Sequence, residues 1–314
     1  MASAAGTRPL QTVILQKCSI ADEDINASLI SWTSLAHTPA NLHECSQRVW
    51  DSAVVDQSFQ TLFNSQSEPY HRARLLAAAA IHSGDWLHAL PIFACGLRLN
   101  DEAVRVAVGL RLGTDICQPH QCVCGSIVDV RGSHALSCKR NAGRIQRHHH
   151  INDLIWRAMS RAGIAAVKEP HGLTRSDGKR PDGLTLIPWR DGRCATWDVT
   201  VTDTTAVSYI ATTSSLTGSA AEAAALRKEA KYTDLSHSYC FFPLAFETMG
   251  PINVEGLSFL SQLGHRISTV TEDPREISFL FQRISIVIQR FNAVCLNNTF
   301  SHVNGDSAGL PDHI

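Results

Sequence analysis

Apolar residues between positions 143 and 162 recur at the spacing of an α-helix. They are Ile151, Leu154, Ile155, Ala158, Met159 and Ala162. These positions fall at i, i+3, i+4, i+7, i+8 and i+11, which places them on one face of a helix. Gly163 follows directly and can end the helix. We therefore expect a long amphipathic helix over 143–162 that buries this face.

The next segments read as strands. Between 193 and 203 the pattern alternates with period two, which is typical of a half-buried strand. One side of this strand carries Trp197, Val199 and Val201, and the other carries Thr196, Asp198, Thr200 and Thr202. Two shorter extended segments are expected at about 164–169 and 182–188. A helix at about 219–235 and a strand at about 238–246 follow.

The order from 143 to 246 is therefore helix, strand, strand, strand, helix, strand. A mixed sheet flanked by helices is the natural packing for that order, so the predicted class is α+β or α/β. Residues 18–115 are expected to be mostly helical, with helices at about 73–82 and 101–112. Two further helices are expected at about 254–270 and 274–296. Residues 1–17 read as a loose leader, Asp22 as the cap of a first helix, and the residues after Thr299 as a frayed tail.

Composition narrows the class of protein. The chain has 314 residues, so one or two domains are expected, and its net charge of -1 means that any basic surface must be local. Neither a signal peptide over Met1 to Ile14 nor an apolar run long enough to span a membrane is recognisable. Ten cysteines are present, and four crowd between Cys117 and Cys138. Without a secretory signal, metal binding or free thiols are expected rather than a disulfide framework.

Cys122, Cys124, His134 and Cys138 supply three thiolates and an imidazole, which is a complete ligand set for a structural Zn²⁺ ion. A Cys-x-Cys pair is less usual than Cys-x-x-Cys, so Cys117 is an alternative to one of the two. Free buried cysteines are the competing interpretation of the cluster.

Two aspartates on neighbouring extended segments suggest a second metal. Asp182 begins one segment and Asp198 lies on the polar face of the next. Adjacent strands lie about 5 Å apart, so the carboxylates can converge on Mg²⁺ or Mn²⁺. Asp182 also stands between Pro181 and Gly183, where it can simply be a turn residue.

The motif residues are Arg180-Pro181-Asp182, then Asp198, then Lys228-Glu229-Ala230-Lys231-Tyr232. This series resembles the PD-(D/E)XK nuclease superfamily. With the cysteine cluster in front, residues from about 84 to 297 resemble the region downstream of the polymerase in non-long-terminal-repeat retrotransposons. The resemblance implies a restriction-endonuclease-like core in which Asp182 and Asp198 bind the catalytic metal.

Two features depart from that family. Thr200 stands where the superfamily usually has a lysine, so the resemblance assigns the lysine role to Lys228 or Lys231, with Lys228 slightly favoured. Nothing in 1–115 offers the Tyr/Phe-x-Asp-Asp turn of the polymerase expected upstream. The chain is therefore expected to be a fragment of a longer element, or a degenerate or co-opted copy.

Several further residues are candidates for the site. Glu169 is a possible third metal ligand or an exposed glutamate, and Asp153 is expected to face solvent. Six lysines and arginines against one acid between 139 and 161 indicate contact with a phosphate backbone or a solvated helix face. The predicted nucleic-acid contacts are Arg140, Arg144, Arg147, His148, Arg180 and Tyr232. Arg147 and His148 are alternatively expected to orient a carboxylate or to pack at the surface.

The predicted function is a nuclear, metal-dependent DNA endonuclease that nicks target DNA to prime reverse transcription, with element RNA as a second partner. A non-catalytic nucleic-acid-binding module is the alternative, and a zinc-stabilised protein scaffold is a weaker third. The expected organisation is a helical region at 1–116, a zinc knuckle at 117–142, the nuclease core at 143–298 and a tail at 299–314.

Overall fold

The computed structural model describes residues 47–300. The chain divides into two compact units, residues 1–67 and 68–314. Within the first, α3 (Gln47–Ser65) is a helix in which Phe59 and Phe63 stack at 5.9 Å between ring centroids. The predictions for the leader, for Asp22 and for most of the tail lie outside the described residues.

A four-stranded mixed sheet forms the centre of the second unit. Its strands are β3 (Ala166–Lys168), β4 (Gly183–Arg190), β5 (Arg193–Thr202) and β6 (Cys240–Glu247), in that spatial order. The first three pair antiparallel, whereas β5 and β6 pair parallel along their length. The β4–β5 ladder ends at the pair Gly183↔Trp197, so β5 continues from residue 198 to 202 beyond the start of β4. This overhanging part of β5 includes Asp198.

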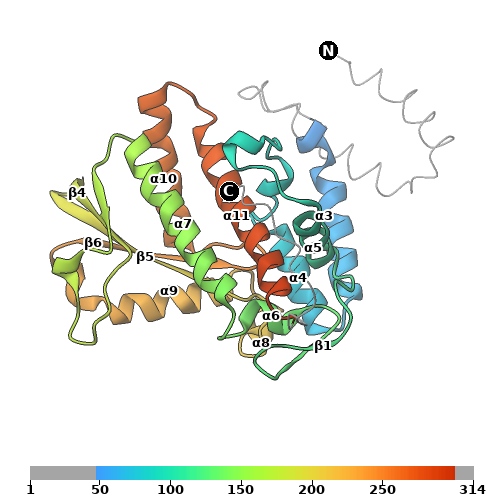
Figure 1. Ribbon diagram of the computed structural model, residues 1–314. Helices are drawn as coiled ribbons and strands as arrows, with labels where there is room; N and C mark the ends of the chain where they lie inside the picture. Colours follow the sequence, from blue (N-terminus) through green and yellow to red (C-terminus); the bar gives the residue numbers. More distant parts are fainter. Residues whose placement is uncertain (1–46, 301–314) are drawn as a thin grey trace, which may run out of the picture. The chain divides into compact units, whose positions relative to one another are not determined.

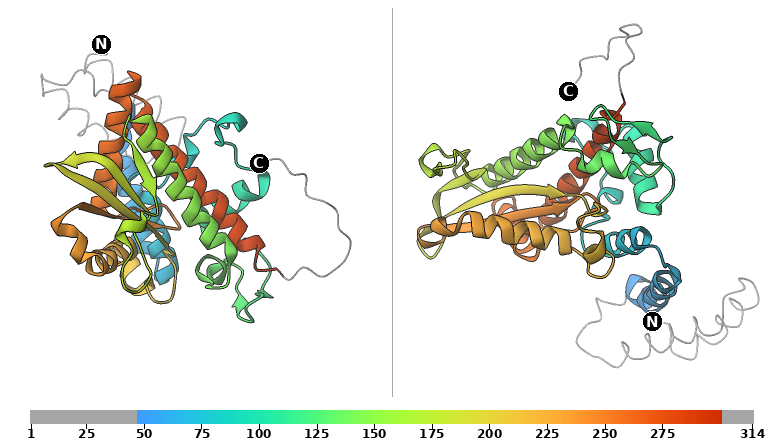
Figure 2. Two further views of the ribbon diagram at one scale, coloured as in Figure 1. Left: turned by 60° about the vertical axis from the view of Figure 1, so that its left-hand side comes forward. Right: turned by 90° about the horizontal axis from the view of Figure 1, so that it is seen from below.

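Helices cover both faces of the sheet (Figures 1 and 2). On one face lie α7 (Ala142–Arg161) and α10 (Val254–Thr271), with α11 (Glu276–Asn297) packed on both of them. On the other face α9 (Ser219–Lys231) contacts β5 and β6, and it provides the crossover between these two parallel strands. A short helix, α8 (Ile210–Thr213), precedes it. The observed order α7-β3-β4-β5-α9-β6 confirms the predicted order and the mixed α+β class.

The main core lies between the sheet and the α7, α10 and α11 layer. The predicted helix face is buried there: Ile151, Ile155 and Met159 are each 0% exposed. Trp197 and Val199 of β5 point into the same core, whereas Asp198 points to the α9 side. The period-two alternation in β5 therefore places the apolar side chains on one face of the strand and Asp198 on the other.

The region before α7 folds onto the same unit. It contains α4 (Pro69–Ala79), α5 (Asp101–Leu112), α6 (Ser133–Ser137), a hairpin of β1 (His120–Gln121) and β2 (Ile127–Val128), and short 3₁₀ turns at Asp85–Leu87 and Phe93–Cys95. A second core joins Val106 of α5, Val128 of β2 and Leu296 of α11. Residues 68–116 therefore share a core with the rest of the 68–314 unit.

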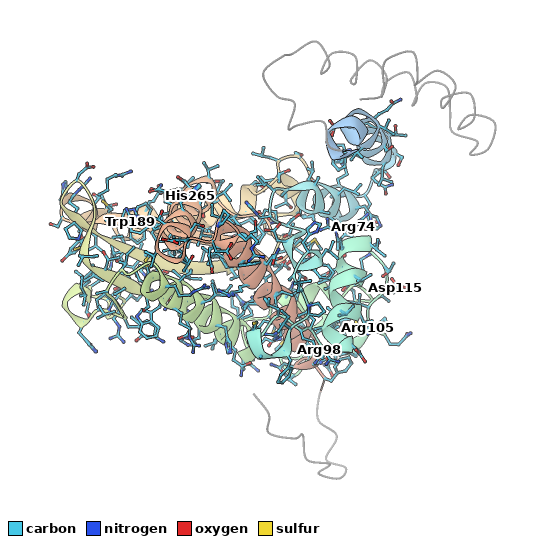
Figure 3. All side chains as sticks on the ribbon, turned by 90° about the horizontal axis from the view of Figure 1, so that it is seen from above. Arg74, Arg98, Arg105, Asp115, Trp189 and His265 are labelled. Atoms are coloured by element: carbon cyan, nitrogen blue, oxygen red, sulfur yellow. The ribbon has the colours of Figure 1, made fainter. Side chains whose placement is uncertain are left out.

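Long arginine side chains tie the segments of this region together (Figure 3). Arg74 of α4 donates through Nη1 to the carbonyl of Arg111, at 2.5 Å. Arg105 of α5 donates to the carbonyl of Ile116, at 2.6 Å. Both guanidinium groups satisfy backbone carbonyls near the end of α5, a role that charged side chains often take at helix C-termini.

Among the described helices, α11 is long and apolar enough to cross a membrane by length and composition alone. Its most apolar window is 72% buried within the protein. It packs against α5, α7 and α10, so it serves as a core helix.

Candidate metal centres

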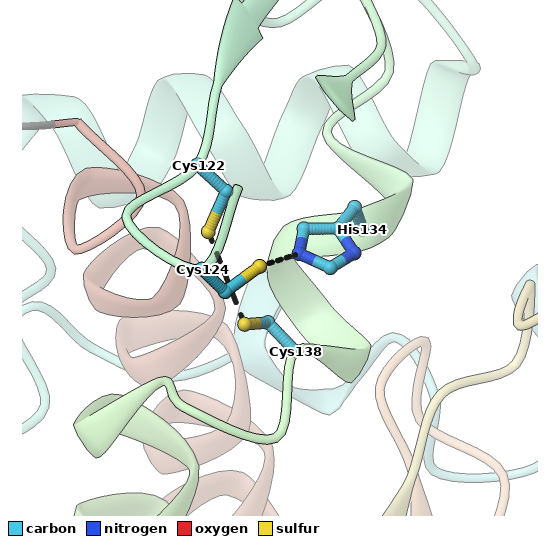
Figure 4. Close-up of side chains that lie close together, drawn as sticks. All are labelled: Cys122, Cys124, His134 and Cys138. Carbon is cyan, nitrogen blue, oxygen red and sulfur yellow. Dashed lines mark hydrogen bonds between the residues drawn. The ribbon is translucent and has the colours of Figure 1, made fainter. Parts of the chain in front are cut away.

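Cys122, Cys124, His134 and Cys138 converge, as their spacing predicted (Figure 4). Cys122 and Cys124 lie in the turn between β1 and β2. They face His134 of α6 and Cys138, the residue that directly follows α6. Gly125 lies in that turn with φ +94°, a conformation that favours glycine. Cys122 and Cys138 are buried, whereas Cys124 and His134 are partly exposed.

The geometry of this cluster is compatible with a zinc site. All four ligand atoms lie within 4.8 Å of one another, with Cys122 Sγ to Cys138 Sγ at 3.9 Å and Cys124 Sγ to His134 Nε2 at 3.1 Å. Tetrahedral Zn–S bonds of about 2.3 Å imply sulfur separations of about 3.8 Å. Cys117 is not part of the group, because its thiol faces the carbonyls of Asp129 and Val130. The eight cysteines of the described part of the chain are all free thiols.

The electrostatics of the cluster differ between its two turn cysteines. Hydrogen bonds with Ser126 lower the pKa of Cys124 to about 6. Burial raises the pKa of Cys122 to about 11. The thiolate is the form that ligates a metal, so Cys124 is already prepared for ligation near neutral pH, whereas Cys122 needs the cation to ionise.

Asp182 and Asp198 also meet, and His148 joins them. The ligand atoms of these three residues lie within 4.8 Å of one another. Asp182 immediately precedes β4, Asp198 lies within β5, and His148 comes from α7. The convergence of the two carboxylates agrees with the geometry expected from the sequence. His148 lies 2.9 Å from Asp182 Oδ2, which agrees with the carboxylate-orienting role that was one of its expected alternatives.

Asp182 is held on the overhanging edge of β5. Its Oδ2 accepts a hydrogen bond from the amide of Val199, at 2.6 Å, and its own amide donates to the carbonyl of Trp197, at 2.8 Å. Gly183 follows because a Cβ there would lie 2.0 Å from the Trp197 ring. The Pro-Asp-Gly series is therefore more than a turn: the glycine lets the tryptophan pack, and this brings Asp182 against β5.

Asn152 supports the same arrangement and was missed in the sequence. Its Oδ1 accepts from Trp197 Nε1, at 2.9 Å, and its Nδ2 donates to the carbonyl of Asp182, at 3.3 Å. It is 4% exposed. Its place four residues after His148 puts both on one helix face, and this spacing was the available signal.

Lys228 of α9 reaches Asp198 from the opposite side. Its Nζ lies 2.5 Å from Asp198 Oδ1, whereas Lys231 Nζ lies 3.8 Å from Asp198 Oδ2. Lys231 instead donates to the Tyr232 hydroxyl, at 2.6 Å, and that hydroxyl donates to the carbonyl of Arg180, at 2.8 Å. The closer amine is thus the one that the sequence slightly favoured.

The carboxylates change the protonation of their surroundings. Burial and the nearby charge of Asp182 raise the pKa of Asp198, although Lys228 acts against them. Burial alone would lower the pKa of His148, but its hydrogen bond to Asp182, at 2.9 Å, and the two carboxylate charges raise it overall. The site therefore favours positive charge next to the aspartates, which is what two crowded carboxylates require.

The remaining acidic candidates are placed elsewhere. Glu169 does not join the three-residue group, because its carboxylate pairs with the guanidinium of Arg180. His148 occupies the third position instead. Asp153 pairs with Arg157, at 2.6 Å, and with Lys168, at 2.9 Å, on the outer side of α7. The expectation that Asp153 stays out of the site is consistent with this placement.

Two residues predicted to contact nucleic acid have buried side chains, so neither offers a contact on the protein surface. Arg147 is 0% exposed and donates through Nη1 to Asn292 Oδ1, at 2.7 Å. Tyr232 is 1% exposed, and burial raises its pKa. Arg140 is exposed, and Arg144 is partly exposed, so both remain predictions. Arg180 is partly exposed beside Glu169 and also remains a prediction.

Comparison with known proteins leaves the site to be interpreted from its own residues. No protein-family model matches the chain, and no curated protein matches it at a significant level.

Proposed function

We propose that this chain is a Mg²⁺- or Mn²⁺-dependent DNA endonuclease of retrotransposon origin. The observation that carries the proposal is the meeting of Asp182 and Asp198, with Lys228 Nζ 2.5 Å from Asp198. An acid pair with an adjacent amine, where β5 extends past the start of β4, is an arrangement that supports phosphodiester hydrolysis.

The fold supports the same proposal. The order α7-β3-β4-β5-α9-β6 is the one expected of a restriction-endonuclease-like core. Asp182 directly precedes β4 and Asp198 lies within β5, and these are the two central strands. The cysteine cluster lies directly before α7, as in the retrotransposon proteins that the sequence resembles. DNA is the proposed substrate and element RNA a second ligand, and the proposed location is the nucleus.

The residues present fit a divalent cation. Two carboxylates are sufficient to seat Mg²⁺, which keeps several of its waters, and the imidazole of His148 is better tolerated by Mn²⁺. When bound, such a cation supplies a Lewis acid for the phosphate and lowers the pKa of a coordinated water.

The protein's own residues supply the rest. Asp182 is held by Val199 and oriented by His148, so its position is fixed before substrate arrives. Lys228 places an ammonium beside Asp198, where it stabilises negative charge that develops on the phosphate oxygens. Lys231 is drawn toward Tyr232 and acts at longer range.

The test is nicking of supercoiled plasmid by the purified full chain in Mg²⁺ and in Mn²⁺. Asp182→Asn and Asp198→Asn keep the size of each side chain and remove its charge, and each should abolish nicking. Asp153→Asn is the matched control, because Asp153 is a carboxylate of α7 outside the group.

Two results would contradict the proposal. Nicking that persists equally in both site variants would show that the activity belongs to another protein in the preparation. Salt-dependent DNA binding without nicking in either metal would identify a non-catalytic binding module instead.

A further inference from the structure

A pocket of about 370 Å³ opens beside the candidate catalytic carboxylates. It lies between the first turns of α7, the segment before that helix, and the overhanging end of β5. We call it the α7 pocket. Its lining residues are Lys139, Asn141, Arg144, Ile145, Arg147, His148, Thr200 and Val201.

The lining favours an anion. The eight described residues that line the pocket include three fixed cations, Lys139, Arg144 and Arg147, and no carboxylate. Arg144 is anchored through Nη1 to the carbonyl of Ser137, at 2.9 Å, which fixes its guanidinium at the rim. The N-terminus of the 20-residue helix α7 adds the positive end of its dipole.

Arg147 is the unusual member of this set. It is 0% exposed, and although Nη1 is bonded to Asn292, its Nε has no hydrogen-bond partner. Within the described residues it forms no ion pair with a carboxylate, since Asp203 influences it only at longer range. A buried guanidinium with an unsatisfied donor is costly unless a counter-charge comes close to it.

The backbone of β5 contributes a further donor. The amide of Val199 points toward the β4 side, because it donates to Asp182 Oδ2. Alternate amides along a strand point the same way, so the amide of Val201 also points to that side, where the β4 ladder has ended. Val201 lines the pocket, so its amide is a candidate donor at this edge of the strand.

The pocket lies next to the acid pair, because His148 lines the pocket and is also hydrogen-bonded to Asp182. Thr200 is two residues beyond Asp198, a span of about 7 Å along a strand. This is on the order of the rise of two nucleotides along a DNA strand. A strand whose scissile phosphate lies at the acid pair would thus bring a neighbouring phosphate to the pocket.

We propose that the α7 pocket binds one backbone phosphate of the DNA strand that is cut, within two nucleotides of the scissile phosphate. Lys139, Arg144 and the Val201 amide hold the phosphate, and Arg147 is the fixed charge behind it. This inference rests on the proposed function for its substrate, but it concerns binding and can be tested without cleavage.

The experiment measures DNA binding in the cleavage-deficient Asp182→Asn background. Fluorescence anisotropy with a labelled duplex gives the affinity across a series of salt concentrations. The double variant Lys139→Ala with Arg144→Ala should bind roughly tenfold more weakly. Its slope of log affinity against log salt should fall by about 1, as expected for one lost phosphate contact.

Two further variants distinguish the loss of a phosphate contact from a purely structural effect. Arg157→Ala removes an exposed arginine of the same helix that pairs with Asp153 and does not line the pocket, so it should change neither quantity. Arg144→Lys keeps the positive charge, so its slope of log affinity against log salt should stay close to that of the parent protein. Thermal unfolding of every variant reports whether the fold is intact.

A scan with neutral methylphosphonates identifies the source of the anion. Replacing one phosphate at a time should weaken binding by the parent protein at one position, and the double variant should be insensitive at that position. If inorganic phosphate competes for the pocket while no position in DNA is sensitive, the site takes free phosphate and the proposal is overturned. An unchanged salt slope in the double variant overturns it as well.

The outcomes separate this inference from the nuclease proposal. If DNA binding depends on the pocket but the protein never nicks DNA, phosphate binding in the pocket is supported and endonuclease activity is refuted. If nicking and DNA binding are unchanged when Lys139 and Arg144 are replaced, endonuclease activity is supported and phosphate binding in the pocket is refuted.

Discussion

A single glycine decides how closely Asp182 approaches its partner strand. The Trp197 ring lies where a side chain at position 183 would begin, with ring atoms 2.0–2.4 Å from a built Cβ. The tryptophan is fully buried and its indole is bonded to Asn152, so it cannot move aside cheaply. Position 183 therefore links the packing of the core to the placement of the Asp182 carboxylate.

We predict that Gly183→Ala destabilises the protein by about 1–3 kcal/mol, the usual cost of overpacking. The change should also reduce nicking, because Asp182 is the preceding residue. Gly172→Ala is the control: its Cβ would meet nothing within 4 Å. Urea unfolding gives both free energies, and equal stabilities for the two variants would contradict the role of Trp197.

The two lysines near Asp198 should differ in their contribution to catalysis. Lys228 is 2.5 Å from the carboxylate and Lys231 is 3.8 Å away. We predict that Lys228→Ala slows nicking by about 10²-fold or more, the usual effect of losing one preorganised charge-stabilising donor. Lys231→Ala should have a smaller effect on single-turnover rates. The opposite ranking would assign the role to Lys231.

The helix that carries these lysines is anchored by a buried carboxylate. The first turn of α9 has no side-chain cap, since Gly218 precedes it. Glu247, at the end of β6, accepts hydrogen bonds from the amides of Ala220 and Ala221 through Oε1, both at 3.1 Å. A neighbouring strand thus satisfies the free amides of the helix and sets where α9 begins.

Burial raises the pKa of Glu247 above its ordinary 4.5. An acid whose pKa is raised by folding is more readily protonated in the folded state, so its contribution is favourable at low pH. That contribution is lost as the pH rises from 4.5 through the raised value. Asp203, also buried with a raised pKa, acts in the same direction.

We therefore predict that Glu247→Gln makes the stability less dependent on pH above 4.5. Glutamine keeps the Oε1 acceptor for α9 and cannot ionise. The free energy of unfolding, measured in urea from pH 4.5 to 8, should fall less steeply for the variant than for the parent protein. Parallel curves would show that Glu247 does not titrate in this range.

The cysteine cluster connects the parts of the 68–314 unit. Cys122 and Cys138 belong to the same apolar core as Val106 of α5 and Leu296 of α11. Asn141 lies between them and α7, donating to the carbonyl of Cys295 at 2.6 Å. A metal in this cluster would therefore stabilise the contact of residues 68–116 with α7 and α11.

We predict that the protein carries one zinc ion in this cluster and that its removal lowers the unfolding midpoint. A loss of about 2–3 kcal/mol corresponds to roughly 5–10 °C in a domain of this size. Cys138→Ser should lose the metal, whereas Cys117→Ser should retain it, because Cys117 faces backbone carbonyls. Elemental analysis and calorimetry provide the two measurements, and zinc loss in Cys117→Ser would contradict the ligand assignment.

Local patterns were sufficient for the elements and for the ligand types. The buried stripe of 143–162 became α7, the alternation of 193–203 became β5, and the helix predicted over 101–112 is α5. The cluster of Cys122, Cys124, His134 and Cys138 was also recognisable. Periodicity and spacing are local properties, and side-chain direction follows from them within one helix or strand.

Only the tertiary structure decided which distant side chains meet and which are buried. It placed His148 rather than Glu169 beside Asp182, buried Arg147 and Tyr232, and left the end of β5 open above the α7 pocket. These outcomes depend on where the β4 ladder stops and on how α7 crosses the sheet. The physical reason is that contacts between segments far apart in sequence are set by the packing of whole elements, which no local pattern encodes.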